Sequence, residues 1–131
     1  MTIATPTTDR LEAVSRTARW TAAARARESR RPDHLFVDPF ADELSGEVGH
    51  ELLFHLPIRT HWFDRFLQER AEEGQQIVGI GAGLDVRAFR LNWPAGTRIF
   101  EVDQASVLDY KEATIAGHDR KPRCERVLAP A

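Results

Sequence analysis

The 131-residue sequence is poor in cysteine, in net charge and in long apolar runs. Its single cysteine, Cys124, has no partner for an internal disulfide, and one thiolate cannot build a thiolate metal site. No apolar run approaches the roughly 20 residues of a membrane-spanning helix. The N-terminal MTIATPTTDR lacks the basic and apolar regions of a signal peptide. These absences predict a cytoplasmic protein with no membrane partner.

Charge and histidine spacing argue against two further kinds of site. The net charge is −2, which is too small to attract nucleic acid. The arginines of residues 1–35 follow a helical pattern with acids among them, which favours a solvated helix face over a nucleic-acid patch. The histidines are scattered without the i, i+4 pairing of helical zinc ligands. We therefore predict no nucleic-acid partner and no bound metal.

The first part of the chain has helical patterns and no strand pattern. Asp9 and Glu12 resemble a capping box, and the apolar positions that follow predict a helix that ends near Ser29, before Pro32.

Two further helices are expected before the first strand. Asp38 precedes Pro39, a pair that predicts the cap and first position of a short helix. A third helix is expected after Pro57, with Gly74 as its C-cap. We interpret residues 1–74 as an N-terminal helical cap region.

Residues 75–131 alternate between strand and helix patterns. QIVGI, TRIFEVD (Thr97 to Asp103) and CERVLAP (Cys124 to Pro130) predict three strands, with a short helix near 85–89 and a longer one in QASVLDYKEATIAG. This β-α-β-α-β order implies parallel strands with right-handed crossovers. The predicted fold class is α/β: N-terminal helices, then the first part of a doubly wound, Rossmann-like sheet that is incomplete.

The glycines of IVGIGAGLD lie in the turn after the first predicted strand. Gly81 and Gly83 let the backbone turn sharply and approach a ligand. Asp103 ends the second predicted strand, 20 residues after Gly83, where an acid can accept hydrogen bonds from ribose hydroxyls. A G-x-G pair alone is a weak signal that any tight turn can carry. Combined with the strand and Asp103, it favours a nucleotide-type cofactor.

Two classes of cofactor bind to this arrangement of strand, glycine turn and acid. A dinucleotide needs the third glycine of G-x-G-x-x-G, and that position holds Val86 or, in the other register, Leu84. Asp85 would also repel a pyrophosphate at the start of the helix. S-adenosylmethionine carries no phosphate, so both features favour S-adenosyl-L-methionine over a nicotinamide dinucleotide.

Four sequence blocks are similar to those of a known family. They are TARWTAAARARESRRPDHLFVDPFA, RTHWFDRFL, IVGIGAGLDVRAFRLNWPAGTRIFEVDQASVLDYK and ERVLAPA. From about Thr17 to Ala131, the chain resembles the N-terminal half of the leucine carboxyl methyltransferase-like family of class I S-adenosylmethionine-dependent methyltransferases. The resemblance is strongest to the bacterial branch that methylates oxygen on small molecules.

The resemblance implies a role for each of four residues. Gly81 and Gly83 would form the cofactor loop, Asp103 would bind the adenosine ribose, and Arg59 would pair with the cofactor carboxylate. A guanidinium suits that last role because it binds a carboxylate in a bidentate manner. Arg87 and Arg90 are interpreted as structural pairing residues, and Arg25 or Arg27 could approach the cofactor from the first helix. The sequence indicates no catalytic residue.

The family fold is a seven-stranded doubly wound sheet, and this sequence provides three strands. Family members continue with the other wall of the cofactor crevice. The resemblance therefore implies a methyltransferase for a small-molecule acceptor, as part of a longer chain. The alternatives are a truncated cofactor-binding fragment without activity of its own and, less favoured, a nicotinamide dinucleotide-binding half-domain. An open sheet edge beside the first strand also predicts self-association.

Overall fold

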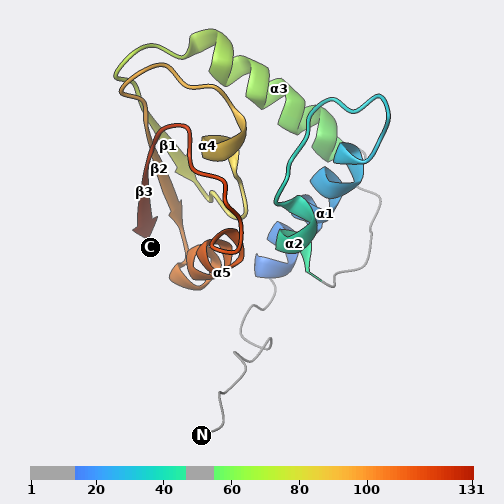
Figure 1. Cartoon of the computed structure of the whole chain (residues 1–131). Helices are drawn as coiled ribbons and strands as arrows, with labels where there is room; N and C mark the ends of the chain where they lie inside the picture. The colour runs from blue at the N-terminus through green and yellow to red at the C-terminus, as the bar shows by residue number, and fades with distance from the viewer. Residues whose placement is uncertain (1–13, 47–54) are drawn as a thin grey trace, which may run out of the picture.

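The computed structural model describes residues 14–46 and 55–131, which are built on a three-stranded parallel sheet. Strands β1 (Gln76–Ile80), β2 (Arg98–Asp103) and β3 (Glu125–Pro130) lie in the order β1-β2-β3. Helix α4 (Arg87–Arg90) lies between β1 and β2, and α5 (Ala105–Ile115) lies between β2 and β3, as Figure 1 shows. The predicted α/β class and strand order are confirmed.

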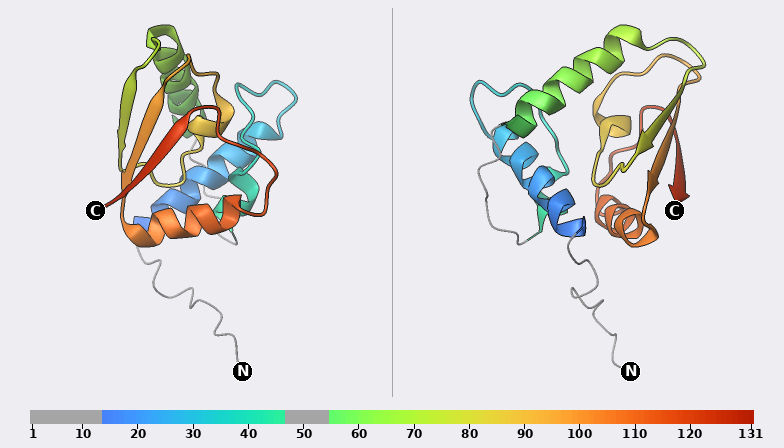
Figure 2. Two further views of the ribbon diagram at one scale, coloured as in Figure 1. Left: turned by 60° about the vertical axis from the view of Figure 1, so that its left-hand side comes forward. Right: turned by 180° about the vertical axis from the view of Figure 1, so that it is seen from behind.

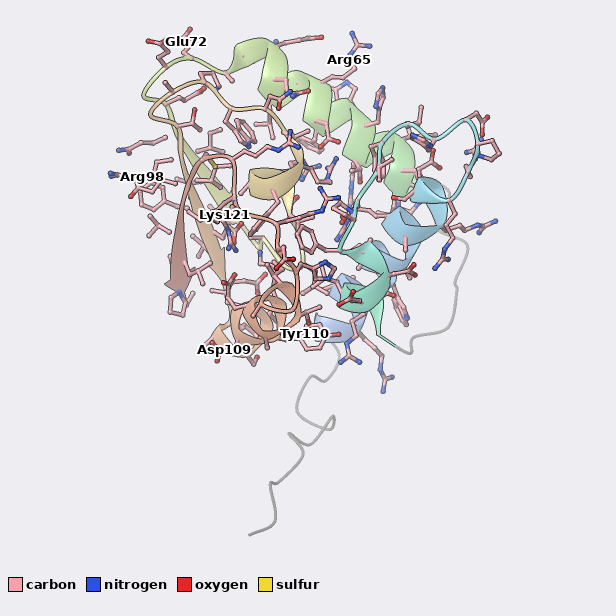
Figure 3. All side chains as sticks on the ribbon, viewed as in Figure 1. Arg65, Glu72, Arg98, Asp109, Tyr110 and Lys121 are labelled. Carbon is pink, nitrogen blue, oxygen red and sulfur yellow. The ribbon has the colours of Figure 1, made fainter. Side chains whose placement is uncertain are left out.

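Three helices precede the sheet: α1 (Val14–Ser29), α2 (Ala41–Ser45) and α3 (His55–Arg70). Helix α1 packs against both α2 and α3. Ala22 is fully buried on α1, and its small side chain allows neighbouring elements to approach closely. The Tyr110 hydroxyl on α5 donates to the Leu44 carbonyl oxygen at 3.1 Å, which ties α5 to α2; Figure 3 labels this tyrosine.

The helices lie to one side of the sheet in Figure 1 and in both views of Figure 2. Along β1, Ile77 packs against the core, whereas Val78 and Ile80 are 58% and 85% exposed. Val78 and Ile80 point to the face of the sheet opposite to Ile77. Their register partners on β2, Phe100 and Val102, lie on the same face as they do. Among the described residues β1 also pairs only with β2. The sheet thus has one bare apolar face and one open edge at β1, although parallel sheets are normally covered on both faces.

Helix α1 ends at Ser29, as predicted. Its predicted start at Asp9 and Glu12 lies outside the described residues.

The predicted limits of the other two N-terminal helices were wrong. Asp38 accepts a hydrogen bond from the Phe40 N–H at 3.0 Å, but α2 begins only at Ala41, so Pro39 belongs to the preceding turn. Helix α3 (His55–Arg70) includes Pro57 rather than following it, and a proline is tolerated in a first helical turn because its missing N–H would have no partner there.

The predicted C-cap of α3 was also wrong. The helix ends at Arg70, and Gly74 instead forms a turn with φ of +70°. The N–H of this glycine donates to the Ala95 carbonyl oxygen at 2.9 Å.

Candidate functional site

A sharp turn follows β1 at the carboxyl end of the sheet. Gly81 and Gly83 have φ of +66° and +52°, the left-handed region that favours glycine. The N–H groups of Gly81 and Ala82 both donate to the Val102 carbonyl oxygen, at 2.8 and 3.0 Å, which fixes the start of the turn on β2. A Cβ atom added to Gly81 would meet nothing within 4 Å. The backbone there is open to a ligand that approaches closely.

Asp103 ends β2 beside this turn. Its Oδ2 accepts the Gly83 N–H at 2.7 Å and its Oδ1 accepts the Gln104 N–H at 2.7 Å. A carboxylate offers about four acceptor positions, so one remains on each oxygen. The side chain is partly exposed and can therefore accept further hydrogen bonds from a ligand.

A crevice of about 1010 Å³ opens over the turn. This volume is at the upper end of the range for small-molecule and cofactor sites. The floor is formed by the carboxyl ends of β1 and β2, and the walls come from α1 and α3. All four sequence-predicted site residues line it: Arg59, Gly81, Gly83 and Asp103. The structure thus brings together residues that are up to 44 positions apart in the sequence.

Arg59 lies on α3 with its side chain exposed. It is available to pair with an anionic group in the crevice. The apolar part of the lining includes Leu56, Phe63 and Leu67 from α3.

An ion-pair network fixes the residues after the turn. The Arg87 Nε donates to Asp64 Oδ1 at 2.7 Å, and the Arg90 Nη2 contacts both oxygens of Asp64 at 2.9 and 3.0 Å. Arg87 also pairs with Asp85. Asp64 is 5% exposed and belongs to α3. These bonds attach α3 to α4, so the interpretation of Arg87 and Arg90 as structural pairing residues agrees with their contacts.

Asp85 lies two residues before the start of α4 at Arg87. Its Oδ1 accepts the Arg87 N–H at 2.7 Å. Burial by itself would raise the pKa of Asp85, but the positive charges of Arg87, Arg25 and Arg90 lower the pKa below its ordinary value. A carboxylate therefore already sits where a dinucleotide would place its pyrophosphate. Val86 is 1% exposed in the core, so no third glycine is available there.

Sequence reasoning missed Lys111 and Glu101. Both are buried, at 0% and 4% exposure, and the Lys111 Nζ lies 3.0 Å from Glu101 Oε2. Glu101 also lines the crevice. For Glu101, the sequence offered one signal. It lies two residues before Asp103, which places both acids on the same face of β2.

A family model described as leucine carboxyl methyltransferase matches residues 50–131. This chain belongs to the leucine carboxyl methyltransferase family.

Relatives within this group are provisionally named S-adenosyl-L-methionine-dependent methyltransferases. One from Saccharopolyspora erythraea is 40% identical over 135 residues, covering 90% of this chain and 47% of the relative. One from Parafrankia is 44% identical over 132 residues, covering 86% of this chain and 43% of the relative. One from Mycolicibacterium smegmatis is 39% identical, covering 92% of this chain and 46% of the relative. The chain spans about half the length of the curated relatives it matches.

Neither a membrane-spanning helix nor a metal-binding cluster occurs among the described residues. No helix in residues 14–46 and 55–131 is long and apolar enough to cross a membrane. In the same ranges, no group of three or more His, Cys, Asp or Glu side chains could hold a metal ion.

Proposed function

We propose that this chain is the cofactor-binding half of an S-adenosyl-L-methionine-dependent methyltransferase that methylates oxygen on a small molecule or carboxylate. One observation carries the proposal. The crevice at the ends of β1 and β2 combines an open glycine turn and Asp103 with a carboxylate, Asp85, where a phosphate would bind. That combination suits a nucleoside cofactor without phosphate.

Each lining residue has a chemical role in this proposal. The free acceptor positions of Asp103 bind the two ribose hydroxyls. The open backbone at Gly81 allows the cofactor to lie against the turn. Arg59 pairs with the cofactor carboxylate through its forked guanidinium.

When bound, S-adenosyl-L-methionine supplies a methyl group activated by a sulfonium. The residues of this chain bind and orient it, and no side chain among the lining residues needs to form a covalent bond. In-line transfer depends on alignment of the acceptor, and alignment of well-oriented reactants contributes about 7–11 kcal/mol. The described residues provide the floor of the crevice and the walls from α1 and α3, and in our proposal the remaining wall, which aligns the acceptor, comes from the rest of a longer chain.

This geometry supports the alternative of a fragment without activity of its own. A nicotinamide dinucleotide-binding half-domain is disfavoured by Val86 and by the carboxylate of Asp85. The partners we propose are a small-molecule methyl acceptor and, through the β1 edge and the bare face, a second copy of the chain. A cytoplasmic location is proposed because the single cysteine fits a reducing compartment.

Calorimetry and a turnover assay test the proposal together. The chain should bind S-adenosyl-L-methionine or its demethylated product more tightly than NAD. The chain alone should show no turnover, whereas the longer Saccharopolyspora relative should release demethylated cofactor with hydroxyl or carboxyl acceptors. Tighter binding of NAD would contradict the cofactor assignment. Methylation confined to nitrogen or sulfur acceptors would contradict the acceptor class.

A further inference from the structure

Charged side chains from three elements bond the backbone of three consecutive residues in the glycine turn. Asp103 on β2 accepts the Gly83 N–H. The Arg25 Nη2 on α1 donates to the Leu84 carbonyl oxygen at 2.8 Å. The Lys111 Nζ on α5 donates to the Asp85 carbonyl oxygen at 3.1 Å. The turn is therefore held from three directions.

Arg25 is itself held in place. It is 9% exposed, and its Nε donates to Asp38 Oδ2 at 2.8 Å. The other oxygen of Asp38 accepts the Phe40 N–H, and the Asp38 N–H donates to the Ser29 Oγ at 2.9 Å. These bonds leave the guanidinium little freedom, so the N-terminal helices determine where its Nη2 meets the turn.

Lys111 is held in the same way from the other side. Its ammonium is fully buried, which is costly unless the charge is paired. Glu101 provides that pairing at 3.0 Å and is also bound by Arg126, whose Nη2 lies 2.7 Å from Glu101 Oε2. The network joins β2, α5 and β3 behind the crevice.

We propose that Arg25 and Lys111 are positioning residues that hold Gly83–Asp85 in the ligand-binding conformation before the cofactor arrives. A turn with two glycines at positive φ is intrinsically flexible. Ordering such a segment during binding lowers affinity, and ordering it in advance avoids this loss. The inference rests on the proposed function for its effect on affinity, but the effect on the turn itself is independent of any ligand.

The variants are chosen to leave no buried charge without a partner. Arg25→Lys keeps a cation beside Asp38, but one ammonium cannot reproduce the two bonds of the guanidinium fork. The double change Lys111→Met with Glu101→Gln removes the buried pair together. Arg30→Gln is the matched control, because Arg30 follows α1, is exposed and pairs with exposed Asp42.

Amide hydrogen exchange without ligand separates positioning from general stability. In Arg25→Lys and in the double variant, we expect the Gly83 and Asp85 amides to exchange at least tenfold faster, with little change at the β2 amides. Uniform acceleration of all amides would indicate a merely structural role and overturn the inference. Unchanged exchange at the turn would also overturn it.

Calorimetry with the demethylated cofactor gives the second measurement. Affinity should fall five- to tenfold in Arg25→Lys, with a less favourable binding entropy, and remain unchanged in Arg30→Gln. An affinity within twofold of the unsubstituted chain would overturn the effect on binding. If the unsubstituted chain binds neither form of the cofactor, the proposed function fails, and the exchange experiment alone decides whether Arg25 and Lys111 hold the turn.

Discussion

Asp103 and Gly83 are joined by a hydrogen bond of 2.7 Å between a carboxylate oxygen at the end of β2 and a backbone N–H in the turn after β1. The bond gives one side chain two tasks: shaping the turn and, in our proposal, holding the ribose. These tasks can be separated because asparagine keeps an oxygen for the Gly83 N–H but removes acceptor positions that the ribose would use.

Asp103→Asn and Asp103→Ala should differ. The asparagine oxygen can still accept the Gly83 N–H, whereas its amide nitrogen cannot accept a ribose hydroxyl. Both variants should lose at least tenfold in affinity for S-adenosyl-L-methionine, since a hydrogen bond to a charged group is worth about 1.5–3 kcal/mol. Asp103→Asn also loses the bond from the Gln104 N–H, whereas Asp103→Ala loses both backbone bonds and should therefore lose about 1 kcal/mol more of unfolding free energy. Calorimetry and denaturant titration measure the two effects; unchanged affinity in both variants would exclude the ribose role.

Arg59→Gln should weaken binding only of ligands that carry the amino-acid carboxylate. We expect a five- to fiftyfold loss for S-adenosyl-L-methionine and no change for adenosine, because the guanidinium faces only the carboxylate in our proposal. Arg65→Gln is the control, since Arg65 lies on the same helix, is 67% exposed and pairs with Glu69, and is labelled in Figure 3. An equal loss for adenosine would show that Arg59 acts elsewhere.

Gly79→Ala and Gly83→Ala should change stability in opposite directions. A Cβ atom at Gly79 would make ordinary contacts of 3.7 and 3.8 Å, and alanine restricts the unfolded chain. We expect an increase of about 0.4–1 kcal/mol in unfolding free energy. At Gly83, φ of +52° disfavours alanine, so we expect a loss of about 1–2 kcal/mol. Denaturant titrations of both variants test the difference.

Asp85→Asn should reduce stability at neutral pH more than at acid pH. The folded-state pKa of Asp85 is lowered, so the ionised carboxylate stabilises the fold above the unfolded pKa of about 3.9. That contribution disappears as the pH falls through the folded-state pKa. The asparagine oxygen can still accept the Arg87 N–H, so mainly the charge is lost, at about 1 kcal/mol after screening. Thermal unfolding at pH 7 and pH 3 should show a difference that shrinks at the lower pH.

Ile80→Lys should reduce self-association. Ile80 is 85% exposed at the open edge and on the bare face, where a lysine opposes pairing with another strand. Leu35→Lys is the control, because Leu35 is 43% exposed but lies outside the sheet. Light scattering should show a lower mass for Ile80→Lys alone. A monomeric unsubstituted chain would contradict the proposal that copies associate here.

The sequence predicted the strands well because each is a short β-prone run between turns. QIVGI became β1 without any change of limits, and Asp103 ended β2 as expected. The limits near Gly74 were wrong because its N–H partner, Ala95, is 21 residues away. Sequence periodicity carries no information about such a bond.

The positioning residues were harder to predict for a related reason. Arg25 and Lys111 donate to backbone carbonyl oxygens 59 and 26 residues away. Every residue has a backbone carbonyl oxygen, so the residue type at the acceptor position does not indicate that such a bond forms there. Only the packing of α1 and α5 against the turn selects these partners.

The bare face and open edge of β1 have a consequence during protein synthesis. The Saccharopolyspora relative is 40% identical over the matched part, which covers 47% of its length, so about half of that relative lies outside the match. A ribosome adds roughly 5–20 residues per second, so synthesis of the other half of a chain of that length takes on the order of 10 s. Whenever these strands form before the elements that cover them are made, the β1 edge, which ends at Ile80, can pair with other strands or bind chaperones.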